Sequence, residues 1–292
     1  MAASSNEDRV LPATRALSIF IIPFLVVGFA VLFFWPGDTK RLFAWTINPR
    51  LTPMVLGSVY LGGAWFFVQA ARATSWRTIK GGFVPVATFA SIMGMNTIIH
   101  WEKFNHTHVA FWLWAGLYFT TPFLVFGVWL ANRRVGEPFP PPARRDISTP
   151  AAVAIGLTGL AATAMGLFLF LTPERAIDKW PWMLTPLTAR GTGGIFCLGV
   201  AGVGIVFDRG WQAVRIPLQV AMVMLVLILV SVVRGWDDLD TSKAFTWVLV
   251  TGFAAVLVGS ALLYRKMSGG SAGAAGSGHE AAPSVDESEH HQ

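Results

Sequence analysis

Eight long apolar stretches, separated by short polar segments, run through the chain. Each has about the 20 residues that an α-helix needs to cross a hydrocarbon core roughly 30 Å thick. The stretches are continuous rather than alternately apolar and polar, so helices are favoured over the strands of a membrane barrel. The predicted spans cover residues 16–35, 53–72, 83–101, 109–132, 150–171, 190–207, 216–233 and 245–264.

The composition agrees with this interpretation. Hydrophobic residues make up 54% of the chain and charged residues 13%, and the mean hydropathy is +0.56, far from the averages of soluble proteins. The first span is followed by Trp-Pro-Gly-Asp rather than by a small-x-small cleavage site, so we interpret it as an anchor and not as a cleaved signal peptide. The expected fold class is an all-α membrane protein with eight transmembrane helices.

The second half of the chain repeats the first at an offset of 135 residues, and tryptophans mark the register. The pairs are Trp45 with Trp180, Trp76 with Trp211, Trp101 with Trp236, and Trp112 with Trp247. A small slip would instead pair Trp45 with Trp182 in the first loop. The repeat predicts two tandem four-helix units. Because each unit has an even number of spans, its copy enters the membrane in the same direction, and the repeats are parallel.

Five segments are expected along the chain. They are a polar cytoplasmic leader at 1–15, a first four-helix unit at 16–134, a Pro-rich basic linker at 135–149, a second unit at 150–266, and a tail at 267–292. The Pro run favours an extended, semi-rigid linker. The Gly-, Ser- and Ala-rich tail cannot bury apolar surface and is predicted to be disordered.

The basic residues predict the orientation. The net charge of +6 is spread over short loops, so it does not indicate nucleic-acid binding. Thirteen of the 22 Lys and Arg residues fall on the side that holds both termini, and nine fall on the other. By the positive-inside rule both termini are expected in the cytoplasm. The expected partners are the lipid bilayer and other membrane protein subunits.

Glycines crowd the second helix of each predicted unit. They are Gly57, Gly62, Gly63, Gly191, Gly193, Gly194, Gly199, Gly202 and Gly204. Small residues let helix backbones approach closely, so these two helices are expected to form the inner seam of the bundle. The alternative is the general enrichment of glycine in membrane helices. Among the polar residues near span ends, Gln69 and Asn96 are expected to hydrogen-bond to neighbouring helices.

The loop before each of these helices ends in a related phrase. The first reads Trp45-Thr-Ile-Asn-Pro49-Arg-Leu-Thr-Pro53, and the second reads Trp180-Pro-Trp-Met-Leu-Thr-Pro186. This phrase resembles one in uncharacterised multi-pass bacterial membrane proteins, and the resemblance covers the loops and the helices after them. It implies a bacterial inner membrane location and transfers no activity. Trp and Pro at a helix entry suit an interfacial anchor, and a ligand-facing role is the alternative.

The densest polar cluster follows the third span. Its candidate metal ligands are His100, Glu102, His106 and His108. Imidazole and carboxylate groups suit Zn, Cu or Fe, although the spacing matches no established metal signature. The equivalent loop of the second unit carries Asp237, Asp238 and Asp240, which would complete a site if the two loops met. The alternatives are another ligand, such as a quinone headgroup, and a hydrated loop without a ligand. The sequence does not identify a cofactor.

The polar residues that the sequence lacks limit the possible functions. No Asp, Glu, Lys or Arg falls near the centre of a predicted span, which disfavours ion-coupled pumps and proton relays. The loops contain no phosphate-binding glycine loop, nucleophile elbow or catalytic triad order. The leading prediction is a non-catalytic scaffold or accessory subunit of a membrane assembly. The alternatives are a permease or channel-like protein for a small neutral or lipophilic solute, and a metal- or cofactor-binding membrane protein that uses the outer His/Glu loop.

Overall fold

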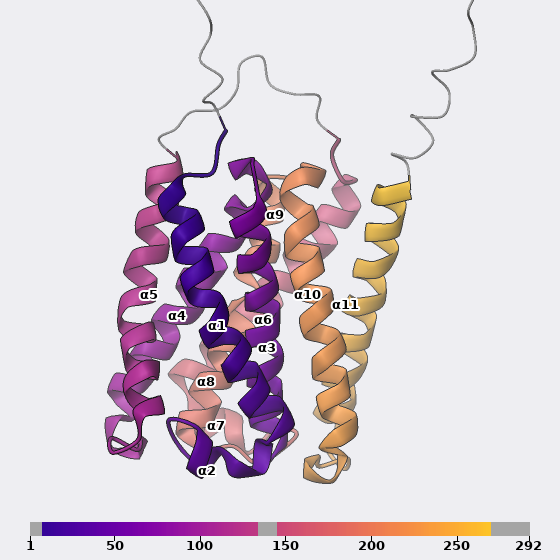
Figure 1. The fold of residues 1–292 in the computed structure, drawn as a ribbon. Helices are drawn as coiled ribbons and strands as arrows, with labels where there is room; N and C mark the ends of the chain where they lie inside the picture. Colours follow the sequence, from indigo (N-terminus) through magenta and orange to yellow (C-terminus); the bar gives the residue numbers. More distant parts are fainter. Residues whose placement is uncertain (1–7, 134–144, 270–292) are drawn as a thin grey trace, which may run out of the picture.

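The computed structural model describes residues 8–133, the first half, and 145–269, the second half (Figure 1). Eight spans in this part of the chain are long and apolar enough to cross a membrane. They are α1 (Pro12–Phe34), α3 (Leu51–Arg72), α4 (Lys80–Ile99), α5 (Val109–Arg133), α6 (Thr149–Leu171), the pair α8 (Pro186–Cys197) and α9 (Val200–Phe207), α10 (Trp211–Arg234) and α11 (Ala244–Gly269). The described residues form no β-strand, so the predicted helical, multi-span membrane fold is confirmed.

The helix ends gather on two opposite faces (Figure 1). The terminal face carries the described ends, residues 8 and 269, and the turn η2 (Trp76–Thr78). The tryptophan face carries Trp45, Trp101, Trp180, Trp182 and Trp236. Its short elements are η1 (Pro36–Asp38), α2 (Thr39–Leu42), η3 (Trp101–Lys103), α7 (Pro173–Ile177) and η4 (Trp236–Asp238). Most of the predicted tail and most of the predicted linker lie outside the described residues. The prediction that the tail begins at residue 267 is wrong, because Met267 is buried and α11 continues to Gly269.

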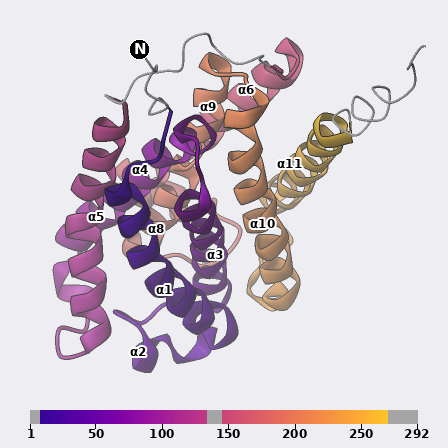
Figure 2. The same ribbon diagram turned by 45° about the horizontal axis from the view of Figure 1, so that its top comes forward.

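Four spans, α3, α4, α8 and α10, make the main contacts between the halves. Within the first half α1 packs on α3 and α4 on α5, and within the second half α6 packs on α8 and α9 and α10 on α11. Between the halves the main contacts join α3 to α10 and α4 to α8. The most apolar window of α3 is 78% buried and that of α11 only 17%, so α3 is a core helix and α11 lies at the edge (Figures 1 and 2).

The closest backbone approach joins α6 to α8 and α9. A Cβ atom on Gly159 would lie 2.4 Å from the carbonyl oxygen of Gly199, and one on Gly166 would lie 2.5 Å from that of Gly193. No side chain fits at these distances, so glycine is required at each contact. The approach replaces side-chain packing by backbone contacts, including weak Cα–H···O interactions.

The glycines of the second helices do not all face the seam between the halves. Gly62 faces Met224 of α10, and Gly194 faces α4, as the prediction requires. Gly57 faces Leu32 and Phe33 of α1, while Gly63 also faces α1, and Gly193, Gly199 and Gly202 face α6. The predicted seam is therefore only part of the role of these glycines. Most of them serve the contact with the first helix of their own half.

The sixth span is broken, where the sequence predicts one helix. The N–H groups of Leu198 and Gly199 bond to carbonyl oxygens three residues earlier, at 3.1 and 2.9 Å, which is the pattern of a tight 3₁₀ turn. Glycine has little preference for the helical conformation, and Gly199 lies where α6 comes closest. The matching span of the first half, α3, is continuous.

The glycine contact yields a stability prediction. We expect Gly159→Ala to lower the free energy of unfolding by about 1–3 kcal/mol, because the new methyl group overlaps the Gly199 carbonyl and both partners are backbone. Thermal or denaturant unfolding in mild detergent measures this change. Gly204→Ala is the control, because nothing lies within 4 Å of that site, and it should be neutral or stabilising by up to about 1 kcal/mol. Equal effects of the two substitutions would contradict the contact.

Candidate functional site

The predicted metal ligands on the tryptophan face are dispersed among different partners. The Nε2 atom of His100 lies 2.8 Å from Nη1 of Arg190, and Nδ1 of His108 accepts the Ala110 N–H at 3.1 Å. The His106 ring packs against Trp101 and Phe111, while Glu102 is exposed. Within the described ranges, no three His, Cys, Asp or Glu side chains come together as a metal-binding group. The metal site stays a prediction without an assembled ligand set.

The contact with Arg190 determines the protonation of His100. A guanidinium only donates hydrogen bonds, so Nε2 of His100 accepts, and the ring is neutral with its proton on Nδ1. Partial burial, followed by the positive charges of Arg190 and Lys103, lowers the pKa of His100 below its usual 6.5, and Glu174 opposes the shift. His100 is therefore a neutral link between the halves near pH 7.

Polar groups join the halves at the starts of the two second helices. The N–H of Leu51 donates to Oδ2 of Asp238 at 2.9 Å, and the indole N–H of Trp182 donates to Oγ1 of Thr52 at 2.9 Å. Asn96 donates from Nδ2 to the carbonyl oxygen of Leu187 at 3.1 Å, which confirms its predicted role between helices. The Asp238 carboxylate also interacts favourably with the positive end of the α3 dipole.

Two arginines cap the ends of the first helices. Nη1 of Arg234 donates to the carbonyl oxygen of Phe33 at 2.7 Å, and Nε of Arg190 donates to that of Phe170 at 3.1 Å. These carbonyls lie in the last turns of α1 and α6, where no helical N–H remains to bond them. Arg234 therefore joins α10 of the second half to α1 of the first.

The loop tryptophans belong to two buried aromatic clusters. The Trp45 ring packs against Phe43, Phe104 and Trp114, with centroid distances of 5.0, 5.0 and 4.7 Å. Trp180 packs against Trp182, Phe196 and Phe245. Trp45 is 6% exposed, Trp180 1% and Trp182 5%, so the predicted role as interfacial anchors is wrong for these three. They fill the core because the loops fold back over the helix ends.

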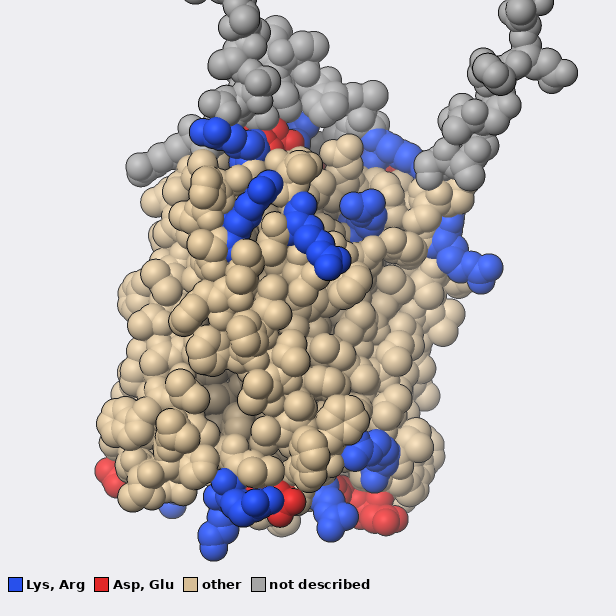
Figure 3. All heavy atoms as spheres, in the orientation of Figure 1, with Lys and Arg blue, Asp and Glu red and all other residues tan. Residues whose placement is uncertain are grey.

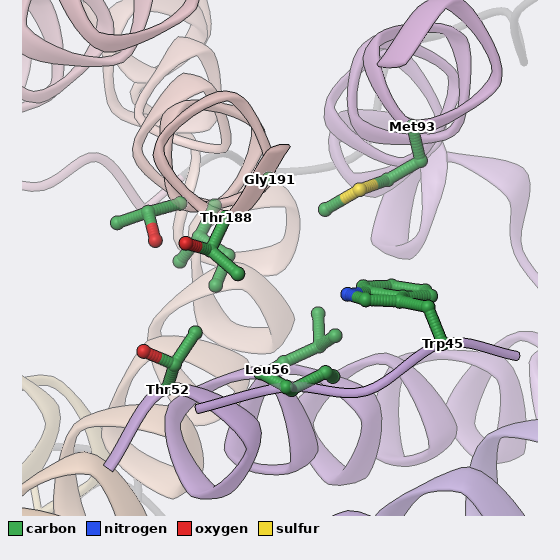
Figure 4. A pocket seen from close by; sticks show the side chains of 9 residues that line it. Trp45, Thr52, Leu56, Met93, Thr188 and Gly191 are labelled. Carbon is green, nitrogen blue, oxygen red and sulfur yellow. The ribbon is translucent and has the colours of Figure 1, made fainter. Parts of the chain in front are cut away.

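A small cavity lies where α3, α4 and α8 meet. Its volume is about 20 Å³, enough for one group the size of a water molecule. The indole nitrogen of Trp45 points into it and has no hydrogen-bond partner in the described chain (Figure 4). Its lining residues are Trp45, Ile47, Thr52, Leu56, Met93, Thr188, Gly191, Thr192 and Ile195. A single small acceptor fits this space, and an organic substrate does not.

Comparison with known proteins adds no relative. No family model, curated protein or solved structure matches the chain. The resemblance of the loop phrase to uncharacterised bacterial membrane proteins therefore stays a prediction.

Sequence reasoning did not assign the capping role of Arg190 and Arg234. Both are basic residues at the ends of apolar runs, which is also the pattern of ordinary loop charges. No local signal distinguishes them, because the capping role depends on which helix end lies opposite each arginine in the fold. Asp238 was noticed only as a possible metal ligand.

The neutral state of His100 predicts a pH effect on stability. A histidine whose pKa is lowered by folding takes up its proton more readily in the unfolded chain, so stability is fully present above pH 6.5 and falls as the pH drops below it. We expect the wild-type chain to unfold at a lower temperature at pH 5.5 than at pH 7.5.

The His100→Gln variant, which can still accept from Arg190, should show a smaller difference between the two pH values. Thermal unfolding at both pH values measures the effect, and an imidazole NMR titration identifies the signal that this variant loses. An unchanged pH dependence in His100→Gln would contradict the role of His100.

Proposed function

We propose that the chain is a non-catalytic scaffold or accessory subunit of a membrane assembly in the bacterial inner membrane. In this proposal it consists of two tandem, parallel four-helix units with both termini in the cytoplasm. Its partners are the lipid bilayer and other membrane protein subunits.

One observation carries the proposal. Several polar side chains of the tryptophan face that would have been available for chemistry instead hold the fold together: Arg190, Asp238 and Arg234 bond to helix ends, and His100 bonds to Arg190. The cavity beside them, at about 20 Å³, excludes a substrate larger than a few atoms. The face thus has the properties of a joint between two helix bundles.

Repeated local contacts support the tandem arrangement. The indole N–H of Trp112 donates to the carbonyl oxygen of His106 at 3.0 Å, and 135 residues later that of Trp247 donates to Thr241 at 3.1 Å. The contacts α3–α10 and α8–α4 are also equivalent under such a repeat. The N–H groups of Asn105 and Asp240 bond to the carbonyls of Ala44 and Pro181, which favours the pairing of Trp45 with Trp182.

The charge distribution supports the orientation. Among the described residues, the terminal face carries eleven Lys and Arg against three Asp, whereas the tryptophan face carries nine against seven Asp and Glu. Figure 3 shows charged side chains near both ends and an uncharged band between them. A basic excess on the terminal face is the pattern of a cytoplasmic surface.

A second candidate function rests on the break in the sixth span. Permeases often bind solutes where membrane helices are interrupted. The break between α8 and α9 lies against α6, with Gly199 close to Gly159. In this alternative a small neutral or lipophilic solute passes between the two units.

Purification from native membranes tests the scaffold proposal. We expect the tagged chain to be recovered in mild detergent with at least one other membrane protein in a fixed ratio, because its apolar surface is available for subunit contact. Untagged cells are the control. Recovery of the chain alone, together with solute flux in reconstituted vesicles, would contradict the scaffold role and favour the permease.

Single-cysteine labelling tests the orientation and the parallel repeat. In a Cys197→Ser background, Thr107→Cys and Ser242→Cys should both react with an impermeant maleimide in intact cells, because both residues are exposed on the tryptophan face. Thr74→Cys, on the terminal face, should react only after permeabilisation. Opposite accessibility of residues 107 and 242 would mean inverted repeats, and labelling of residue 74 alone would reverse the orientation.

A further inference from the structure

The core helix α3 opens to the surface along a single strip. Of its residues only Trp65 and Arg72 are exposed, and Gln69 between them is half-buried. A spacing of four and then three residues places all three on one side of the helix. The strip therefore runs from a tryptophan within the span to an arginine at the terminal face.

A hydrogen-bond network connects this strip to α10 and α11. The indole N–H of Trp65 and the amide Nε2 of Gln69 both donate to Oε1 of Gln219, each at 3.3 Å. Nε2 of Gln219 in turn donates to the hydroxyl of Tyr264 at 2.8 Å. The network confirms the expectation that Gln69 bonds to a neighbouring helix, and it fixes α3 and α10 in register.

Three arginines lie around the terminal-face end of the network. Arg72 follows Gln69 by three residues and Arg215 precedes Gln219 by four, so in these antiparallel helices both lie about one turn, roughly 5 Å, nearer the terminal face. Nη2 of Arg15 donates to the carbonyl oxygen of Ala73 at 3.0 Å, which brings a third guanidinium beside Arg72. The region is therefore strongly basic.

No carboxylate in the described chain neutralises these groups. Neither Arg72 nor Arg215 forms an ion pair there. Two acidic residues of the terminal face have other partners: Asp8 accepts from Ser75 and from the backbone of Arg77, and Asp208 pairs with Lys80. Figure 3 shows basic side chains on the upper part of the face formed by α1, α3, α10 and α11, above the uncharged band.

We propose that the strip on α3, together with Arg215 and Gln219 of the neighbouring helix α10, binds one anionic phospholipid. From here on the strip means these five residues, Trp65, Gln69, Arg72, Arg215 and Gln219. The guanidinium groups suit the phosphodiester of the headgroup, since arginine forms paired hydrogen bonds with phosphate oxygens. Trp65 lies deeper in the span and presents an exposed ring to the acyl chains. Basic sites between membrane helices at the headgroup level are typical of this recognition.

A lipid fits the strip better than a soluble phosphate compound does. Trp65 and Gln69 are part of a membrane span, so a ligand that contacts them must extend into the hydrocarbon region. A phospholipid does so with its glycerol backbone and acyl chains. The inference requires only that the terminal face lies at a membrane surface, and it holds for either orientation and with or without partner subunits.

Native mass spectrometry of delipidated protein in neutral detergent tests the inference. Titration with phosphatidylglycerol should show one tightly retained lipid per chain, and phosphatidylcholine should bind at least about tenfold more weakly. The Arg72→Gln/Arg215→Gln variant should lose at least about tenfold in affinity for phosphatidylglycerol. The Arg133→Gln/Lys266→Gln variant, which removes the same charge from the ends of α5 and α11, should bind like the wild type.

A charge-preserving variant separates lost charge from lost structure. Arg72→Lys/Arg215→Lys should keep most of the binding, and thermal unfolding should be similar for all variants. Equal retention of the two lipids, or an equal loss in the Arg133/Lys266 variant, would overturn the site. Competition by soluble glycerol phosphate as strong as that by the lipid would assign the site to a soluble phosphate compound instead.

Discussion

Helix ends at the edge of a hydrocarbon layer must find hydrogen-bond partners within the protein, and this requirement organises the tryptophan face. Each helix ends with N–H or C=O groups that lack an intrahelical partner, and lipid supplies none. Here two of these partners come from the opposite half: Asp238 accepts from the Leu51 N–H at the start of α3, and Arg234 donates to the Phe33 carbonyl at the end of α1. Removing one half would leave buried polar groups of the other unpaired, so the halves depend on each other.

The same dependence determines how much of the molecule the sequence can predict. Span positions follow from length and hydropathy, which are local properties, and all eight are confirmed. The cross-half bonds are not local, since Arg234 and Phe33 are 201 residues apart. In the sequence Arg234 has the pattern of an ordinary loop charge and Asp238 that of a metal ligand. Their roles depend on which helix end lies opposite, and only the fold determines that.

The first two spans of each half pack on each other by different means. In the first half, large residues pack against glycines: Tyr60 of α3 lies on Gly28 of α1, and Phe33 of α1 lies on Gly57 of α3. The second half brings α6 and α8–α9 into backbone contact through paired glycines and breaks the span at Leu198 and Gly199. Tryptophan spacing and hydropathy are insensitive to this difference, because both modes of packing use apolar residues of the same average hydropathy. Which face each glycine occupies follows from the fold.

The arginines of the molecule form two groups, according to whether or not they donate to a backbone carbonyl of the protein. On the tryptophan face, Arg190 and Arg234 point back to helix carbonyls and are used within the protein. On the terminal face, Arg15 and Arg145 do the same toward the carbonyls of Ala73 and Met267. Arg72 and Arg215, by contrast, bond to no carbonyl of the described chain, and the Gln69–Gln219 bond joins the helices beneath them. Arginines that the fold does not require for its own hydrogen bonds remain available to external anions. At a membrane surface the most abundant external anion is a lipid phosphate, so the lipid site follows from the same hydrogen-bond accounting as the joint.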